Sequence, residues 1–512
     1  MEKSIIFIVT VLVFLNVYLF TDEERALYNK YQNRENLTCT DNILERLAVD
    51  ADKYPNLKTI HLKSYKAQIP EALGQFKNVE SLTITNEYSG SSNLYLPESI
   101  GQLTKLKFLD VSNCRLAKLP ETIGGLTQLK EVRLNSNELR VLPKGVGKWT
   151  QVEKIRLNHN RLKTLPNEVG AWVALEEITL YNNFLSLLPE EIAAWKKVNH
   201  LQLTQNRLSR LPNSLGQLSE LVIINAGDNQ LKTLPASLVE LKKLEQLFLQ
   251  NNRLDSLPEL MENWQLSKLH YLDLSKNKLK GLPNKIGSLA SLKLLDLTSN
   301  QLMHLPNEIG NLRQLETLSL SKNKLEEVPS TIGGISNLKV LNLKFNFINS
   351  VPVGLFTLSK LEYLNISYNR LEDLPSNIGQ LQNMEELYLQ KNALKRLPAT
   401  IANLQVLREL NLSKNQLSQL PESIGKLYLL MSLNVGKNEL TSIPETIGQL
   451  QNLEYFTIVS NQLESFPSSL IKLKGLKRLS LSQNRMEEQL PKEAYYDILN
   501  ALKKELSNTS VQ

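Results

Sequence analysis

The stretch Leu305–Leu325, LPNEIGNLRQLETLSLSKNKL, contains one complete unit of a pattern that repeats along the chain. Leu318 and Leu320 alternate with small polar residues, which is the period of a half-buried strand. Ile309 and Leu312 stand three residues apart, as on the inward face of a short helical turn. Each unit therefore predicts one short strand and one return segment.

Prolines mark the length of this unit, because proline presets the backbone dihedral at the entry to the return segment. Nineteen of the 20 prolines belong to the series, at positions 70, 97, 120, 143, 166, 189, 212, 235, 258, 283, 306, 329, 352, 375, 398, 421, 444, 467 and 491. Fifteen of the 18 intervals are 23 residues long, and the others are 27, 25 and 24. A fixed period of this length predicts a solenoid, here with about 19 strands between Ile60 and Leu479.

Written generally, the unit is LPxxIGxLxxLxxLxLxxNxL, and it resembles the leucine-rich repeat family. The 23-residue form is similar to the Ras-suppressor-like subgroup and to plant intracellular Ras-group-related repeat proteins. The resemblance covers residues 59–491, about 85% of the chain. It implies an α/β solenoid, a horseshoe with a parallel sheet on its concave face and helical caps at both ends. It also implies protein binding as the default role.

Asparagine follows the strand in 16 repeats, as Asn323 does. Its amide carries two donor hydrogens and an acceptor oxygen, so it can satisfy buried backbone groups in its own repeat and in the next. We interpret these residues as a structural ladder. Cys114 occupies the same slot and is interpreted as a buried structural thiol rather than a nucleophile. The ladder residues singled out are Cys114, Asn137, Asn160, Asn323, Asn346, Asn369 and Asn392.

The ends of the chain differ from the repeats. Residues 5–20 carry no charge, with Lys3 before them and acidic residues after them. This predicts a signal peptide or, since no small-x-small cleavage site follows, an uncleaved membrane anchor over residues 1–20. A buried core helix is the third reading. The domain prediction continues with a juxtamembrane linker and N-terminal cap (21–58), the repeats (59–491) and a C-terminal capping helix (492–512).

Composition and motifs argue against catalysis. Two cysteines exclude a disulfide-rich scaffold and a cysteine-based zinc site, and none of the five histidines is paired at helical spacing. The chain has no P-loop, dinucleotide fingerprint, HExxH or GxSxG motif. A net charge of +7 is mild for 512 residues and does not indicate nucleic-acid binding. We therefore predict no enzyme, cofactor, metal, small-molecule substrate or nucleic-acid partner.

The concave face is left as the functional surface. Aromatic side chains flanked by lysines are typical of interface hot spots. The predicted partner-binding residues are Lys322, Lys344, Phe345, Tyr363, Tyr368, Tyr388, Lys391, Lys414, Phe248 and Tyr271. Glycosylation sequons at Asn365 and Asn411 share this face, where glycans would obstruct it.

The leading hypothesis is a non-catalytic scaffold that is membrane-anchored, secreted or periplasmic rather than cytoplasmic. It binds a protein partner of acidic or mixed charge on the concave face, and it touches the membrane through residues 5–20 if these are retained. One alternative is a structural or adhesive cell-surface protein that binds glycan or matrix. Another is an intracellular signalling scaffold.

Overall fold

The computed structural model describes residues 26, 29–87, 93–257, 266–486, 491–506 and 509–511. The predicted signal peptide or anchor at residues 5–20 lies outside them. Within these described ranges, no helix is long and apolar enough to cross a membrane. The chain divides into two compact units, residues 1–221 and 222–512.

The first unit is a parallel sheet in which each strand pairs with the next along the chain. Its strands are β1 (Asn36–Thr40), β2 (Thr59–Ser64), β3 (Ser81–Asn86), β4 (Phe108–Asp110), β5 (Glu131–Arg133), β6 (Lys154–Arg156), β7 (Glu177–Thr179) and β8 (His200–Gln202). Its helices are α3 (Asp41–Ala48) and the 3-10 helices η1 (Ala51–Lys53), η2 (Glu71–Gln75), η3 (Glu98–Gln102), η4 (Glu121–Gly125), η5 (Lys144–Lys148), η6 (Asn167–Ala171), η7 (Glu190–Ala194) and η8 (Asn213–Gln217).

The second unit repeats this plan, again with parallel pairing between successive strands. Its strands are β9 (Ile223–Asn225), β10 (Gln246–Phe248), β11 (Tyr271–Asp273), β12 (Leu294–Asp296), β13 (Thr317–Ser319), β14 (Val340–Asn342), β15 (Tyr363–Asn365), β16 (Glu386–Tyr388), β17 (Glu409–Asn411), β18 (Ser432–Asn434), β19 (Tyr455–Thr457), β20 (Arg478–Ser480) and β21 (Ser510–Val511).

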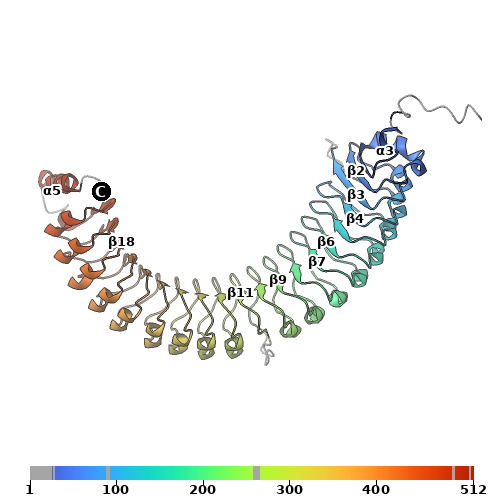
Figure 1. Cartoon of the computed structure of the whole chain (residues 1–512). Helices are drawn as coiled ribbons and strands as arrows, with labels where there is room; N and C mark the ends of the chain where they lie inside the picture. Colours follow the sequence, from blue (N-terminus) through green and yellow to red (C-terminus); the bar gives the residue numbers. More distant parts are fainter. Residues whose placement is uncertain are drawn as a thin grey trace, which may run out of the picture. The chain divides into compact units, whose positions relative to one another are not determined.

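The helices of the second unit are short 3-10 segments and one terminal α-helix. They are η9 (Ala236–Glu240), η10 (Asn284–Ser288), η11 (Asn307–Asn311), η12 (Ser330–Gly334), η13 (Val353–Thr357), η14 (Ser376–Gln380), η15 (Ala399–Asn403), η16 (Glu422–Lys426), η17 (Glu445–Gln449), η18 (Ser468–Lys472) and α5 (Lys492–Glu505). Within each unit the strands form one side of the coil and the 3-10 helices form the other (Figure 1).

The expected solenoid of short parallel strands is confirmed, since β2 to β20 are the 19 strands that the repeat predicts. Strands β1 and β21 were not predicted, and each pairs with the outermost repeat strand of its unit. The C-terminal helix is also shorter than expected, because it ends at Glu505 and β21 follows. Leu502 in this helix and Leu506 directly after it are buried.

The apolar positions of each repeat form a continuous core between the strands and the 3-10 helices. In the typical unit, Ile309, Leu312, Leu318 and Leu320 are completely buried. The proline before each of the helices η2 to η18 that the structure describes has φ between −62° and −73° at the helix N-cap. Proline prefers this value, so it positions the chain to enter the helix at little cost.

Candidate binding surface

Each ladder asparagine joins two repeats. Asn323 donates its Nδ2 hydrogens to the carbonyl oxygens of Leu297 at 2.9 Å and Leu320 at 3.0 Å. Its Oδ1 accepts the backbone N–H of Leu302 at 3.0 Å. The same kinds of bond are made by the other predicted ladder asparagines, Asn137, Asn160, Asn346, Asn369 and Asn392. These bonds satisfy backbone groups where the chain leaves the sheet.

Cys114 takes the ladder slot in its own repeat. Its Sγ donates to the carbonyl oxygen of Ile84 at 3.2 Å or of Ser112 at 3.1 Å. Burial raises the pKa of the Cys114 thiol to about 12. A thiol must lose its proton to act as a nucleophile, so this group is held in its inert form at neutral pH. Both Cys114 and Cys39 are free thiols.

The residue just before the ladder position adopts a left-handed backbone conformation. Phe345 has φ 58°, Tyr368 φ 57° and Lys391 φ 56°. The sequence analysis assigns these side chains to the concave face. Strands β14, β15 and β16 are each three residues long and end three residues before Phe345, Tyr368 and Lys391. These residues therefore lie in the turns that follow the strands. We call the side chains of these turns the rim of the sheet. A bulky residue in this conformation costs about 1–3 kcal/mol, which the surrounding packing must offset.

Two aromatic rings pack against each other on this rim. The centroids of the Phe345 and Tyr368 rings lie 4.1 Å apart, with the planes inclined at 40°. The Lys344 ammonium lies 5.1 Å from the Phe345 centroid and 5.2 Å from that of Tyr368. The Lys391 ammonium lies 4.9 Å from the Tyr368 centroid. We call Lys344, Phe345, Tyr368 and Lys391 the rim cluster.

The rim cluster is rich in unpaired positive charge. Neither of its lysines forms an ion pair with any carboxylate among the described residues, nor do Lys322 and Lys414 in nearby repeats. Lys322, Lys391 and Lys414 are exposed, as is 39% of Phe345. Exposed cations held against an aromatic face can be desolvated by a partner at low cost, since the ring already stabilises their charge.

Tyr363 and Tyr388 lie beside the rim cluster, on strands β15 and β16. Their ring centroids are 5.5 Å apart. The Tyr388 hydroxyl donates to Glu386 Oε2 at 2.9 Å. Burial, together with the carboxylates of Glu409 and Glu386, raises the pKa of Tyr388 well above its usual value. Both side chains are half-buried, and together they form an aromatic surface next to the rim cluster.

The sequons on this face carry asparagines that are already engaged. Asn365 is 6% exposed, its Nδ2 donates to the Tyr363 hydroxyl at 3.0 Å, and its Oδ1 accepts from Ser367 Oγ. Asn411 Oδ1 accepts from Ser413 Oγ at 2.8 Å. In the folded protein, these asparagines therefore support the surface through hydrogen bonds.

The second predicted aromatic group is separate from the first. Phe248 and Tyr271 pack with centroids 4.7 Å apart on β10 and β11. Strands β12 and β13 lie between them and the strands of the rim cluster. Burial raises the pKa of Asp273, beside this pair, and Asp296 adds to the effect. The structure thus places the ten predicted binding residues in two groups of unequal charge.

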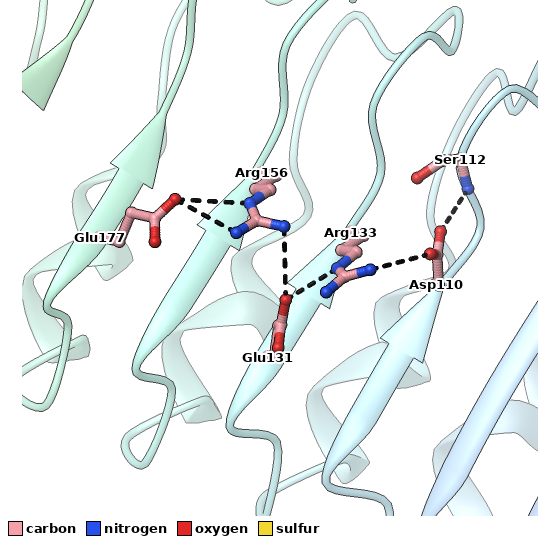
Figure 2. A network of polar contacts seen from close by, with 6 residues as sticks. All are labelled: Asp110, Ser112, Glu131, Arg133, Arg156 and Glu177. Carbon is pink, nitrogen blue, oxygen red and sulfur yellow. Dashed lines mark hydrogen bonds and ion pairs between the residues drawn. The ribbon is translucent and has the colours of Figure 1, made fainter.

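Five charged residues on the first unit's sheet form a network of ion pairs. Figure 2 shows the chain of contacts, in which Glu131 Oε1 lies 2.7 Å from Arg133 Nε and 3.6 Å from Arg156 Nη1. Arg156 also reaches Glu177 at 3.4 Å, and Arg133 approaches Asp110 at 3.9 Å. The network joins three carboxylates to two guanidinium groups, whereas the lysines of the rim cluster have no carboxylate partner among the described residues.

Family models for leucine-rich repeats match much of the chain. The model described as a leucine-rich repeat region matches residues 307–392 and 387–510, and two further leucine-rich repeat models match 267–325 and 105–126. A solved leucine-rich repeat protein of Leptospira interrogans is 33% identical over 79% of this chain and 95% of its own, with a TM-score of 0.64. The chain belongs to the leucine-rich repeat family. The resemblance to the Ras-suppressor-like subgroup stays a prediction.

Other leucine-rich repeat structures are similar at lower identity. The Arabidopsis receptor kinase HAESA, solved with the peptide hormone IDA and the co-receptor SERK1, is 27% identical, with a TM-score of 0.60. The match covers 88% of this chain and 81% of that one. YopM from Yersinia enterocolitica is 26% identical over 81% of this chain and 85% of its own, with a TM-score of 0.54. A search of curated proteins gave no match.

Sequence reasoning missed two features of these leucine-rich repeats. One is the charge network of Figure 2. Aligning the strands at the 23-residue period would have revealed it, because Asp110, Arg133 and Arg156 are partners on successive strands. The other is the left-handed turn, for which no sequence signal exists in this chain. Glycine, the usual marker of that conformation, does not adopt it at any described position here.

Proposed function

We propose that this chain is a non-catalytic binding protein that holds a protein partner at the rim cluster and the adjoining tyrosines, Tyr363 and Tyr388. The observation that carries the proposal is the contact between the tilted Phe345 and Tyr368 rings, which are flanked by two lysines with no acidic partner among the described residues. Aromatic anchors of this kind supply most of the energy in protein interfaces. Membership of the leucine-rich repeat family, and the peptide-bound HAESA structure, support a protein or peptide as the ligand.

The repeat architecture favours binding because it fixes the side chains in advance. The Asn346 and Asn369 ladder bonds hold the turns that carry Phe345 and Tyr368. A surface that is ordered before binding loses little conformational entropy on association. The lysines would face carboxylates of the partner, and Glu386 and Glu409 would face a basic or donor group. The partner we propose is therefore acidic where it meets the rim.

A photo-crosslinking amino acid at Phe345 in living cells would identify the partner by mass spectrometry, and direct titration would then measure its affinity. Substituting Phe345→Ala together with Tyr368→Ala is expected to weaken binding about 30-fold or more. This corresponds to a loss of about 2 kcal/mol of binding free energy, the size of one hot-spot residue.

Phe347→Ala is the matched control. Phe347 is equally exposed, at 40%, and also lies under a cation, with Arg370 4.5 Å from its centroid. It stands two residues beyond Phe345, on the other side of the ladder position. Equal affinity of the double variant and this control would refute the assignment of the site.

We also propose that the protein is exported or held at a membrane through residues 5–20. The lack of charge in that segment supports this. Membrane fractionation with an alkaline wash, combined with intact mass, tests it. Retention in the membrane at 58.2 kDa is expected for an anchor, and a soluble shortened product for a signal peptide. A soluble full-length product would contradict both.

A further inference from the structure

A strongly basic surface lies in the first unit, away from the strands. It is formed by the segments that run from the ladder position to the next proline. We call this surface the basic flank; its cations are Arg115, Lys118, Arg140, Arg161, Lys163, Arg207 and Arg210, and all of them are exposed. The same segments contain only one acidic residue, Glu138.

Part of the basic flank is hollow. A cavity of about 690 Å³ is lined by Tyr95, Arg115, Lys118, Glu138, Arg140 and Arg161, together with Asn93 and Ala117. Arg161 Nη2 pairs with Glu138 Oε2 at 2.7 Å. Lys118 and Arg140 have no ion pair with a carboxylate in the described part of the chain. The cavity lining therefore holds four cations and one carboxylate, so its net charge is positive.

The positive surface has a definite boundary. A neighbouring hollow shares Tyr95 and Lys118 but is lined on its other side by Glu71, Glu98 and Glu121. An anion would be repelled there, so the favourable path runs the other way, from Lys118 past Arg140 towards Lys163 and Arg207. Successive repeats advance by about 4.8 Å, the spacing of neighbouring strands. The cations of the basic flank thus recur at roughly 5–10 Å along a line.

We propose that the basic flank binds a linear acidic polysaccharide, a sugar chain bearing sulfate or carboxylate groups. A row of cations at regular spacing matches a chain of regularly repeated anions, and its binding releases counterions. Tyr95, which is 39% exposed at the cavity, offers an apolar ring face against which a sugar can pack. This site goes beyond the proposed function, because it uses a different surface and a different ligand.

Two other polyanions fit the observations less well. An anionic bilayer is flat and would not fill a cavity of this size. Single-stranded nucleic acid is bound by successive aromatic side chains on which the bases stack, whereas the cavity has one aromatic residue, Tyr95. Both are therefore treated as competing outcomes of the experiment.

The experiment titrates the full-length protein with heparin as a sulfated probe, hyaluronate as a carboxylated probe and neutral dextran, over a series of salt concentrations. We expect binding of an acidic polysaccharide but not of dextran. Substituting Lys118→Ser with Arg140→Ser should weaken binding at least tenfold. It should also lower the slope of log affinity against log salt by about two, one for each lost cation.

Lys395→Ser with Arg396→Ser is the matched control. These residues occupy the equivalent slots in the second unit but face Glu372 at 3.8 Å and Asp373 at 3.1 Å. The control should titrate like the wild type. The rim variant Phe345→Ala with Tyr368→Ala should do the same, so a failure of the polysaccharide proposal can be told apart from a failure of the proposed protein-binding site.

Three results would overturn the proposal. One is the absence of binding to both acidic polysaccharides. Another is an identical salt slope for the Lys118/Arg140 variant and its control. The third is tighter binding of phosphatidylserine vesicles or single-stranded DNA, lost in the same variant, which would assign the basic flank to a lipid surface or to nucleic acid.

Discussion

At the scale of single residues, the ladder asparagine stabilises the repeat through its hydrogen bonds. Asn323 is 6% exposed and makes hydrogen bonds to backbone groups of its own repeat and of the preceding one. Removing such a side chain leaves several buried donors and acceptors without partners, and water cannot reach them. The cost of that loss exceeds the value of any one of the bonds.

Replacement of Asn323 by alanine is therefore expected to lower the free energy of unfolding by about 1–3 kcal/mol. Thermal and urea denaturation followed by circular dichroism would measure it. Lys324→Ala, an exposed change in the adjacent residue, should have little effect. Identical melting curves for Asn323→Ala and wild type would contradict the structural role of the ladder.

The ladder could be predicted from the sequence, but the geometry of the rim could not. The recurrence of asparagine at one slot of the unit identifies it, because only a side chain with donors and an acceptor suits that place. Phe345 and Tyr368 have no such signal. Their left-handed backbone, and the contact between their rings, depend on hydrogen bonds between neighbouring repeats, such as that from Phe345 N–H to Ser367 O at 3.0 Å.

At the scale of elements, 3-10 helices η11 and η12 stack so closely that Gly310 has no room for a side chain. A Cβ placed on Gly310 in η11 would lie 2.1 Å from the carbonyl oxygen of Thr331 in η12. This is backbone and cannot move aside without shifting the whole helix. By contrast, a Cβ on Gly281, in a turn before η10, would meet nothing closer than His304 Nε2 at 3.8 Å.

Gly310→Ala is expected to destabilise the protein by about 1–3 kcal/mol through overpacking. Gly281 has space for a Cβ and a negative φ. Gly281→Ala should therefore be neutral, or stabilise the protein by up to about 1 kcal/mol because alanine lowers the conformational entropy of the unfolded chain. Urea titration of the two variants gives the comparison. A smaller loss for Gly310→Ala than for Gly281→Ala would show that the helices do not stack as described.

At the scale of the whole molecule, each repeat buries its apolar face only against its neighbours, so the last repeat needs a cover. In the second unit α5 and β21 provide it. Val511 of β21 lies opposite Leu479 of β20, and Thr509 Oγ1 donates to Leu476 O at 2.7 Å. Without this cover, the edge of β20 would be open to pairing with another molecule.

Deletion of residues 492–512 is therefore expected to lower the melting temperature and to cause association. The deletion removes Leu502 and Leu506 and exposes the apolar side chains that they cover, which costs about 1.5–3 kcal/mol for each large side chain exposed. Differential scanning calorimetry and size-exclusion chromatography are the measurements. Lys503→Ser with Lys504→Ser changes only exposed positions of α5 and should remain monomeric. A deletion variant that melts and elutes like this control would mean that the last repeat needs no cover.

The sequence by itself determined the repeat, the number of its strands and the identity of the core, because a 23-residue period with leucine at fixed positions allows one way to bury the apolar side chains. It also pointed to aromatic and lysine residues near β14 to β16. Only the tertiary structure decided which of these side chains meet, since Tyr363 and Tyr388 are brought together by pairing between residues 23 or more positions apart. The same is true of the charge network in Figure 2 and of the basic cavity. Contacts between repeats depend on register and turn geometry, which the order of residues within one repeat does not specify.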